Sequence, residues 1–325
     1  MKTTNLYLGI IAATLLFVCS CGHDDNHRLA HRGVYHWKAT YNPTDWEKQW
    51  MKDHKVERLY IKLFDVEAGY MNDKPDWKMV PVATTLFRQE LPDDIAVVPV
   101  VYITVGAIQE LGDLSWNTEL KNLYASLIVK RIDDMMQDHW SGTLREVQID
   151  CDWTDQTEQT YFALVKAIRD NLHQRGITLS GTVRLHQLAE QQYIPFDRSL
   201  LMCYNTGNLH SRETRNSILD FDDVRPYLRQ YKANTLPETD VAFPVFGWGV
   251  EYRKDGTFRR LIHSSHMPES SNDSVRVEWG QQKDICETQS ALPLLDADHT
   301  TILYHLDSLN LSHYSHEDIE TFYSR

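Results

Sequence analysis

The sequence predicts a single α/β domain, a (β/α)8 barrel of the TIM type, from three observations. Short apolar or β-branched runs recur along the chain, and helical periodicity follows most of them. Eight such runs are present, which is the number of parallel strands that closes this kind of barrel. No GxGxxG motif, and no GxxxxGK followed by Ser or Thr, comes after any run, which disfavours the competing open sheet in its phosphate-binding forms.

The predicted strands and helices follow one another along the chain. Strands are expected at Gly33–Lys38, Val56–Phe64, Ile95–Ile103, Glu146–Asp152, Thr178–Val183, Leu200–Tyr204, Val241–Gly247 and Thr301–Leu306. Helices are expected at Thr44–Lys52, Asn117–Gln137, Gln156–His173, Phe221–Lys232 and Gly280–Leu294. The barrel domain therefore covers residues 33–325. A polar stretch rich in turn residues predicts an insertion after strand seven, at about 253–279.

The helix expected after the fourth strand shows the periodicity most clearly. One stripe of its surface is apolar and consists of Tyr161, Leu164, Val165, Ile168 and Leu172. Asp155 is the predicted N-cap of this helix, and Glu158 in the first turn complements the helix dipole. Asn117 is the predicted N-cap of the preceding helix.

Composition excludes several classes of function. With 46 acidic and 33 basic side chains, the net charge is −13, so no basic surface is expected to follow a nucleic-acid backbone. A hydrophobic content of 42% and a charged content of 24% are those of a globular domain. The 15 histidines form no HExxH or comparable spacing, so neither a catalytic metal nor another cofactor is predicted.

The N-terminus has the features of a targeting segment. Residues 1–20 contain a basic start and an apolar region, Leu6–Val18, that is shorter than a comfortable membrane span. Ser20 and Cys21 resemble a bacterial lipobox, in which the Cys is lipidated and becomes the new N-terminus. We therefore expect a lipoprotein of the cell envelope, anchored to the outer membrane through a tether at 21–32. The alternative is a plain secretory signal.

The fourth strand carries the chain's most distinctive polar pattern. Because side chains alternate along a strand, Gln148, Asp150 and Asp152 share one face. The opposite face is apolar and consists of Val147, Ile149 and Cys151. The polar set is therefore expected in the barrel lumen, where two neighbouring carboxylates differ in pKa and can divide proton duties. The alternatives are a hydrogen-bonded polar plug or a metal site without histidines.

Three motifs resemble those of the chitinase-like glycoside hydrolase family 18. Residues 148–152, QIDCD, resemble part of the strand-four signature DxxDxDxE, and residues 202–205, MCYN, resemble the strand-six motif MxYD or MxYN. Residues 243–248, FPVFGW, resemble the strand-seven stretch PFYGR, with Trp248 where the family usually has Arg. The chain also resembles uncharacterised chitinase-related bacterial barrels with a similar QIDxD stretch.

The resemblance implies an enzyme acting on N-acetylhexosamine-containing glycans, by a mechanism in which the substrate's own acetamido group attacks the anomeric carbon. Asp152 would orient that group, and Asp150 would tune Asp152. Tyr204 would donate a hydrogen bond to the acetamido carbonyl, with Asn205 beside it. These four residues are the expected catalytic set.

One departure from the family pattern leaves the activity open. The family's general acid, a Glu, corresponds to Thr154, whose hydroxyl is no acid near neutral pH. Another carboxylate would then have to supply the proton; the candidates are Asp152 itself, Asp155, Asp65 and Glu67. Alternatively, a strand-four carboxylate and Glu251 form an ordinary retaining pair, which requires about 5–5.5 Å between them. In the third interpretation, the barrel binds a glycan without cutting it.

Further residues at strand ends suit a saccharide cleft. Trp37 and Trp248 are expected to stack on sugar rings, and Arg184, His305 and Asp307 to bond sugar hydroxyls. The alternatives are core or lid packing for the tryptophans and structural hydrogen bonds for Arg184 and His305. The expected partners are therefore a glycan and, through the lipid, a membrane.

Overall fold

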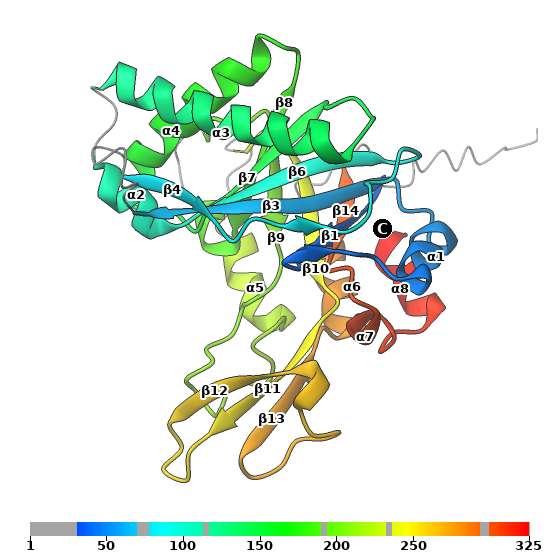
Figure 1. The fold of residues 1–325 in the computed structure, drawn as a ribbon. Helices are drawn as coiled ribbons and strands as arrows, with labels where there is room; N and C mark the ends of the chain where they lie inside the picture. The colour runs from blue at the N-terminus through cyan, green and yellow to red at the C-terminus, as the bar shows by residue number, and fades with distance from the viewer. Residues whose placement is uncertain are drawn as a thin grey trace, which may run out of the picture.

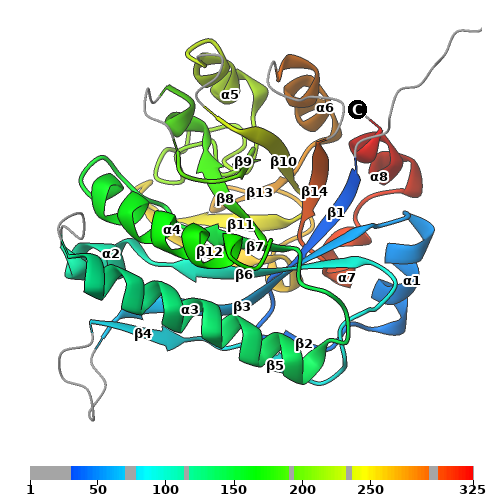
Figure 2. The same ribbon diagram turned by 90° about the horizontal axis from the view of Figure 1, so that it is seen from above.

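The computed structural model describes residues 31–69, 78–112, 117–189, 194–231, 236–292 and 299–324. The predictions of a signal peptide at 1–20, of lipidated Cys21 and of most of the tether concern residues outside this part. Eight strands are parallel, and β1 pairs with both β3 and β14, which closes the sheet into a barrel. The predicted (β/α)8 fold is therefore confirmed, and Figure 2 shows the barrel end-on with its surrounding helices.

Each barrel strand overlaps one predicted strand. In chain order the barrel strands are β1 (His31–His36), β3 (Arg58–Ala68), β6 (Ala96–Ile103), β7 (Glu146–Asp150), β8 (Thr178–Arg184), β9 (Arg198–Met202), β10 (Glu238–Pro244) and β14 (Thr300–Tyr304). β4 (Met79–Val82) pairs antiparallel with the end of β3, and β2 (Thr40–Tyr41) pairs with β5 (Leu86–Phe87).

The helices pack outside the strands. They are α1 (Asp45–Asp53), α2 (Val105–Leu111), α3 (Thr118–His139), α4 (Glu158–His173), α5 (Phe221–Leu228), α6 (Gln282–Ala291), α7 (Ser308–Leu311) and α8 (His316–Tyr323), with short 3-10 turns η1 (Leu185–Ala189) and η2 (Ser264–His266). All five predicted helices are present, whereas α2, α7 and α8 were not predicted. None of the described helices is long and apolar enough to cross a membrane.

The two predicted helix caps have different outcomes. Asn117 does cap α3, because its side chain accepts the Leu120 amide at 3.0 Å. The assignment of Asp155 as the N-cap of α4 is wrong, since Thr157 occupies that position. Thr154 is the reason: its carbonyl accepts the amides of Thr157 and Glu158 at 2.8 and 2.9 Å, so a turn precedes the helix and moves its start.

An antiparallel sheet of three strands follows β10. It consists of β11 (Gly247–Tyr252), β12 (Phe258–His263) and β13 (Val275–Trp279), with β11 in the centre. A Cβ at Gly247 would lie 2.4 Å from the Trp279 ring, so only glycine fits where this sheet begins. Figure 1 shows the sheet projecting from one end of the barrel. Because β11 follows the end of β10, that end is the carboxyl end of the strands.

Apolar side chains fill both sides of the barrel wall. Val147, Ile149 and Cys151 pack between strand and helices, as the alternation along the fourth strand predicted. A second cluster fills the lumen and consists of Tyr35, Tyr60, Val98, Val100, Leu200, Met202, Tyr204, Ala242 and Ile302. The Tyr35 hydroxyl donates to Gln148 there, so the polar face of β7 does point inward. The lumen is therefore filled with packed side chains, and these form the floor of any site at the end of the barrel.

Candidate functional site

A cavity of about 630 Å³ lies at the carboxyl end of the barrel strands. In (β/α)8 barrels this end carries the functional residues. Lining side chains come from the strand ends and from β12: Trp37, Asp65, Tyr102, Asp150, Asp152, Arg184, Met202, Tyr204, Asn205, Phe246, Gly247, Trp248, Leu261, Ile262, His263, Tyr304, His305 and Asn310. All four residues predicted as catalytic, and four of the five predicted to bind substrate, are brought together here.

Asp150 lies at the end of β7, where the cavity meets the floor. Its side chain is buried and accepts a hydrogen bond from the Thr182 hydroxyl at 2.6 Å. Burial raises the pKa of the Asp150 carboxyl, while the nearby Arg184 guanidinium and the Thr182 hydrogen bond oppose the rise. Burial of Asp150 therefore favours the neutral form of its carboxyl.

Asp152 forms an ion pair with Arg184. The Arg184 Nε donates to its Oδ1 at 2.5 Å, and Nη2 contacts the same oxygen. The Asp152 side chain is 45% exposed, against 19% for Arg184, so the pair lies at the cavity wall. Both residues were predicted to lie in the site, and in the structure they bind each other there.

Tyr204 differs from the other tyrosines that line the cavity. Its hydroxyl is buried and has no hydrogen-bond partner among the described residues, although it lies at the cavity. Burial raises the pKa of the Tyr204 phenol well above its ordinary value, so it remains a hydrogen-bond donor. An unsatisfied buried donor is costly, and a ligand acceptor in the cavity would remove that cost.

Trp37 is half-buried at the end of β1. Its ring packs against Tyr35 at 5.6 Å and Tyr304 at 5.7 Å between centroids. The Lys62 ammonium lies 5.8 Å from the centroid of the ring. These contacts hold the indole in place, and the part that faces the cavity is available to a ligand.

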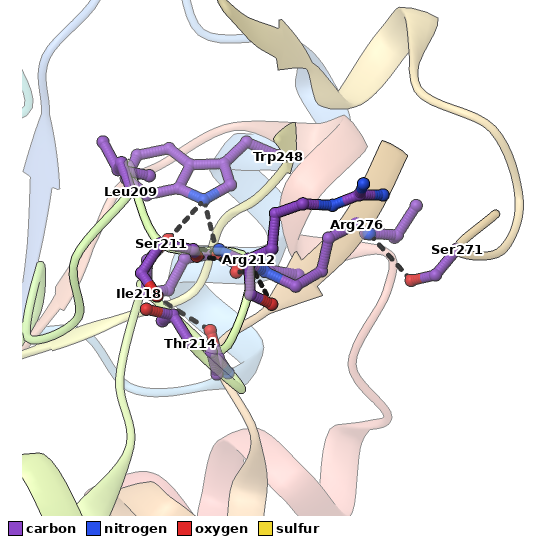
Figure 3. Close-up of polar contacts among 12 residues, drawn as sticks. Leu209, Ser211, Arg212, Thr214, Ile218, Trp248, Ser271 and Arg276 are labelled. Atoms are coloured by element: carbon purple, nitrogen blue, oxygen red, sulfur yellow. Dashed lines mark hydrogen bonds and ion pairs between the residues drawn. The ribbon is translucent and has the colours of Figure 1, made fainter. Parts of the chain in front are cut away.

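Trp248 is held by polar contacts from β13 and from the loop that follows β9 (Figure 3). Its Nε1 donates to Glu278 Oε2 at 2.8 Å and to the Ser217 hydroxyl at 3.3 Å. Its ring packs against Phe246, 5.2 Å between centroids. Trp248 therefore presents ring surface to the cavity, while its single hydrogen-bond donor points elsewhere.

The remaining predicted residues differ in position. Asn205 is exposed in the cavity wall and has a positive φ of 58°. His305 lines the cavity, and burial lowers its pKa to about 4, so its imidazole is neutral near pH 7. Asp307 does not line the cavity, because it binds Lys38 at 2.9 Å and caps α7 through the Asn310 amide.

The candidates for a proton donor are mostly outside the cavity. Thr154 is exposed and does not line it, and the same holds for Asp155 and Glu67. Glu251 points to Arg259 and Arg260 on β12, at 2.9 and 2.5 Å, instead of to the cavity. Asp65 lines the cavity but pairs with Lys62 at 2.9 Å. Of the described residues, only Asp65, Asp150 and Asp152 bring a carboxyl to the site.

Several lining residues were not predicted. Tyr102 and Tyr304 lie at the ends of β6 and β14, and burial raises the pKa of Tyr102 to about 12. The sequence did offer a signal for both tyrosines, because each lies close to the carboxyl end of a predicted apolar strand. Leu261, Ile262 and His263 come from β12, and nothing in their sequence indicates that the insertion folds over the cavity.

One group of described side chains has ligand types suited to a metal ion. His54, His316 and Glu320 lie between α1 and α8, away from the residues that line the cavity. Both Glu320 oxygens accept from Arg32 at 3.0 Å, and one also contacts His54 at 2.8 Å. Because the guanidinium already neutralises this carboxylate, the group acts as a hydrogen-bonded link between the two helices.

The fold, but not the sequence, has clear relatives among known proteins. No protein-family model and no curated protein matches the chain. The spore cortex-lytic enzyme SleL of Bacillus cereus superposes with a TM-score of 0.55 at 13% identity, covering 90% of this chain and 74% of that one. The glycoside hydrolase family 18 chitinase ChiB of Flavobacterium johnsoniae gives 0.54 at 13%, covering 91% and 94%.

The class V chitinase of Nicotiana tobaccum gives a TM-score of 0.53 at 10% identity, covering 90% of this chain and 99% of that one. A mutant of the tobacco enzyme is known in complex with NAG4. The barrel therefore has the fold of the family 18 chitinases, as the three motifs predicted. At such identities the likeness establishes the fold alone, and the function has to be argued from the residues in the cavity.

Proposed function

We propose that the cavity binds an N-acetylhexosamine-containing glycan and that the protein holds this glycan without cleaving it. The absence of cleavage is inferred from the position of Thr154. Where the chitinase pattern has its general acid, this chain has an exposed threonine outside the cavity lining. Loss of a general acid typically costs about 10²–10⁴-fold in rate.

The cavity's chemistry supports a saccharide ligand. Sugar rings have apolar faces and polar edges, and the cavity lining offers both complements: aromatic surface from Trp37 and Trp248, and polar groups from Arg184 and the partly exposed Asp152. Sites of this kind are mostly apolar, with a few polar groups that fix orientation. The unpartnered Tyr204 hydroxyl is a donor suited to an acetamido carbonyl.

Hydrolysis is the second candidate, and one observation favours it. Asp150 has a raised pKa caused by burial, which is the property of a carboxyl that donates a proton. Against this, Asp150 is only 3% exposed and its Oδ1 is occupied by Thr182, which leaves it poorly placed to reach a glycosidic oxygen. We therefore rank binding first.

A calorimetric titration with tetra-N-acetylchitotetraose tests the proposal. Protein from Gly22 onward is expected to bind one molecule, whereas cellotetraose, which lacks the acetamido groups, is expected to bind at least about tenfold more weakly because the Tyr204 donor stays unpaired. Chromatography of the same samples is expected to show the intact tetrasaccharide. Shorter products that disappear in Asp150→Asn would establish hydrolysis instead, and equal binding of both sugars would contradict the acetamido assignment.

We also propose that Cys21 carries a lipid that anchors the protein at the cell envelope. β1 begins at His31 at the amino end of the barrel strands, and the cavity lies at their carboxyl end. Nine residues separate Cys21 from His31, so the ten steps from one to the other span at most about 33–36 Å. An anchor at that end leaves the cavity facing away from the membrane, toward glycans in the surroundings.

The Cys21→Ser variant tests the anchor in a Gram-negative host. It is expected to lose incorporation of labelled fatty acid and to leave the membrane fraction, because the lipid on Cys21 is the proposed anchor. A variant with Cys286→Ser is the matched control and is expected to stay labelled. Unchanged labelling of Cys21→Ser would refute the lipid site.

A further inference from the structure

Glu278 is a buried carboxylate beside the cavity that the proposed function does not use. It lies on β13, and its side chain is 1% exposed. Three donors surround it: the Trp248 indole Nε1, the Ser217 hydroxyl and the Arg276 guanidinium. A buried charge is tolerated only when it is paired and hydrogen-bonded, so the three donors stabilise the buried Glu278 carboxylate. In turn, the carboxylate holds the three donors in place.

Arg276 connects this carboxylate to the loop that follows β9. Its Nη1 donates to the Ser211 carbonyl at 3.0 Å, and its guanidinium lies 5.4 Å from the centroid of the Tyr252 ring. The Tyr252 hydroxyl donates to the carbonyls of Leu209 and Ser211, each at 3.0 Å. Figure 3 shows how the loop and the sheet meet around Trp248 and Arg276.

The same loop carries the polar corner of the cavity. The loop leaves β9 through Tyr204 and Asn205, and the backbone N–H of Asn205 donates to the Ile218 carbonyl at 2.6 Å. Ser217, next to Ile218, is one of the three donors to Glu278. The Glu278 carboxylate thus joins both cavity walls, the Trp248 indole on one side and the loop that begins at Tyr204 on the other.

We propose that Glu278 is a positioning residue that fixes the Trp248 ring as a stacking face for one sugar unit of the ligand. Because its carboxylate takes the only N–H of the indole, Trp248 cannot donate to a sugar hydroxyl and contacts the ligand through ring carbons. The inference rests on the proposed glycan binding. It assigns to Glu278 no contact with the ligand itself.

A double-mutant cycle tests the positioning role. Glu278→Gln removes the charge and redistributes the hydrogen bonds, and we expect about tenfold weaker binding of tetra-N-acetylchitotetraose. Trp248→Phe keeps a ring but removes the N–H. In a Trp248→Phe background, Glu278→Gln is expected to change affinity less than twofold, because its effect passes through that indole. An equal loss in both backgrounds, or no loss in either, would overturn the proposal.

A control variant separates positioning from general destabilisation. Glu146→Gln alters another buried carboxylate, paired with Arg58 at 3.0 Å at the amino end of β7, far from the cavity along the strand. This variant is expected to lower the unfolding temperature without weakening the binding of the tetrasaccharide. If Glu146→Gln weakened binding as much as Glu278→Gln, the effect would be one of stability.

A readout without ligand keeps the two proposals distinguishable. The Trp248 indole N–H resonance can be assigned by its absence in Trp248→Phe. We expect it to shift and to exchange faster with solvent in Glu278→Gln, whether or not a glycan binds. If the wild type binds no tetrasaccharide, the proposed function fails; if this resonance is unchanged in Glu278→Gln, the positioning role fails.

Discussion

Trp37→Ala is expected to weaken binding of tetra-N-acetylchitotetraose at least about 30-fold, the effect of losing one buried tryptophan anchor from a binding site. The indole is pre-oriented by Tyr35, Tyr304 and Lys62, so a ligand gains its surface at little entropic cost. Calorimetry on the two proteins gives the ratio of dissociation constants directly.

Trp46→Ala is the matched control for this substitution. Trp46 lies in the first turn of α1, is 45% exposed and does not line the cavity. The substitution removes a side chain of the same type and is expected to leave the dissociation constant within twofold of that of the wild type. A loss at Trp46 as large as that at Trp37 would mean that the ligand binds elsewhere.

Asp240→Ala is expected to lower the free energy of unfolding by about 3–5 kcal/mol, the largest stability effect we predict. Asp240 lies on β10 and is 2% exposed. Its Oδ1 accepts from Arg198 on β9 at 2.8 Å and from the Thr300 amide of β14 at 2.6 Å, so it joins three barrel strands. Alanine leaves the Thr300 amide without its acceptor, and it leaves the largely buried Arg198 guanidinium with only the exposed Glu238 carboxylate as an ion-pair partner.

Glu238→Ala controls for this effect, because Glu238 contacts the same Arg198 from an exposed position. Surface pairs contribute at most about 1 kcal/mol, so this variant is expected to unfold almost as the wild type does in urea. Similar midpoints for Asp240→Ala and the wild type would show that the three strands do not depend on this carboxylate.

The barrel was predictable from sequence because its strands are buried on both faces and read as apolar runs. The helix α4 was predicted for a related reason, since its apolar stripe is continuous from Tyr161 to Leu172. α2 was missed because it has only seven residues, too few to show a period. The N-cap of α4 was misplaced because Asp155 and Thr157 are both plausible caps, and a turn held by the Thr154 carbonyl decides between them.

The cavity was predictable only in part. Alternation along β7 identified Asp150 and Asp152, and the strand ends identified Trp37 and Trp248. Sequence spacing could not reveal the pairing of Arg184 with Asp152, because it joins neighbouring strands in the closed barrel. For the same reason, Asp307 was predicted to bind the ligand, whereas in the structure it pairs with Lys38, which follows β1.

A crystal structure with tetra-N-acetylchitotetraose shows directly whether the cavity holds a glycan. We expect an intact tetrasaccharide in the cavity, with sugar rings against Trp37 and Trp248 and an acetamido carbonyl within hydrogen-bond distance of the Tyr204 hydroxyl. A sugar bound outside this cavity, or a cavity that stays empty at saturating tetrasaccharide, would contradict it.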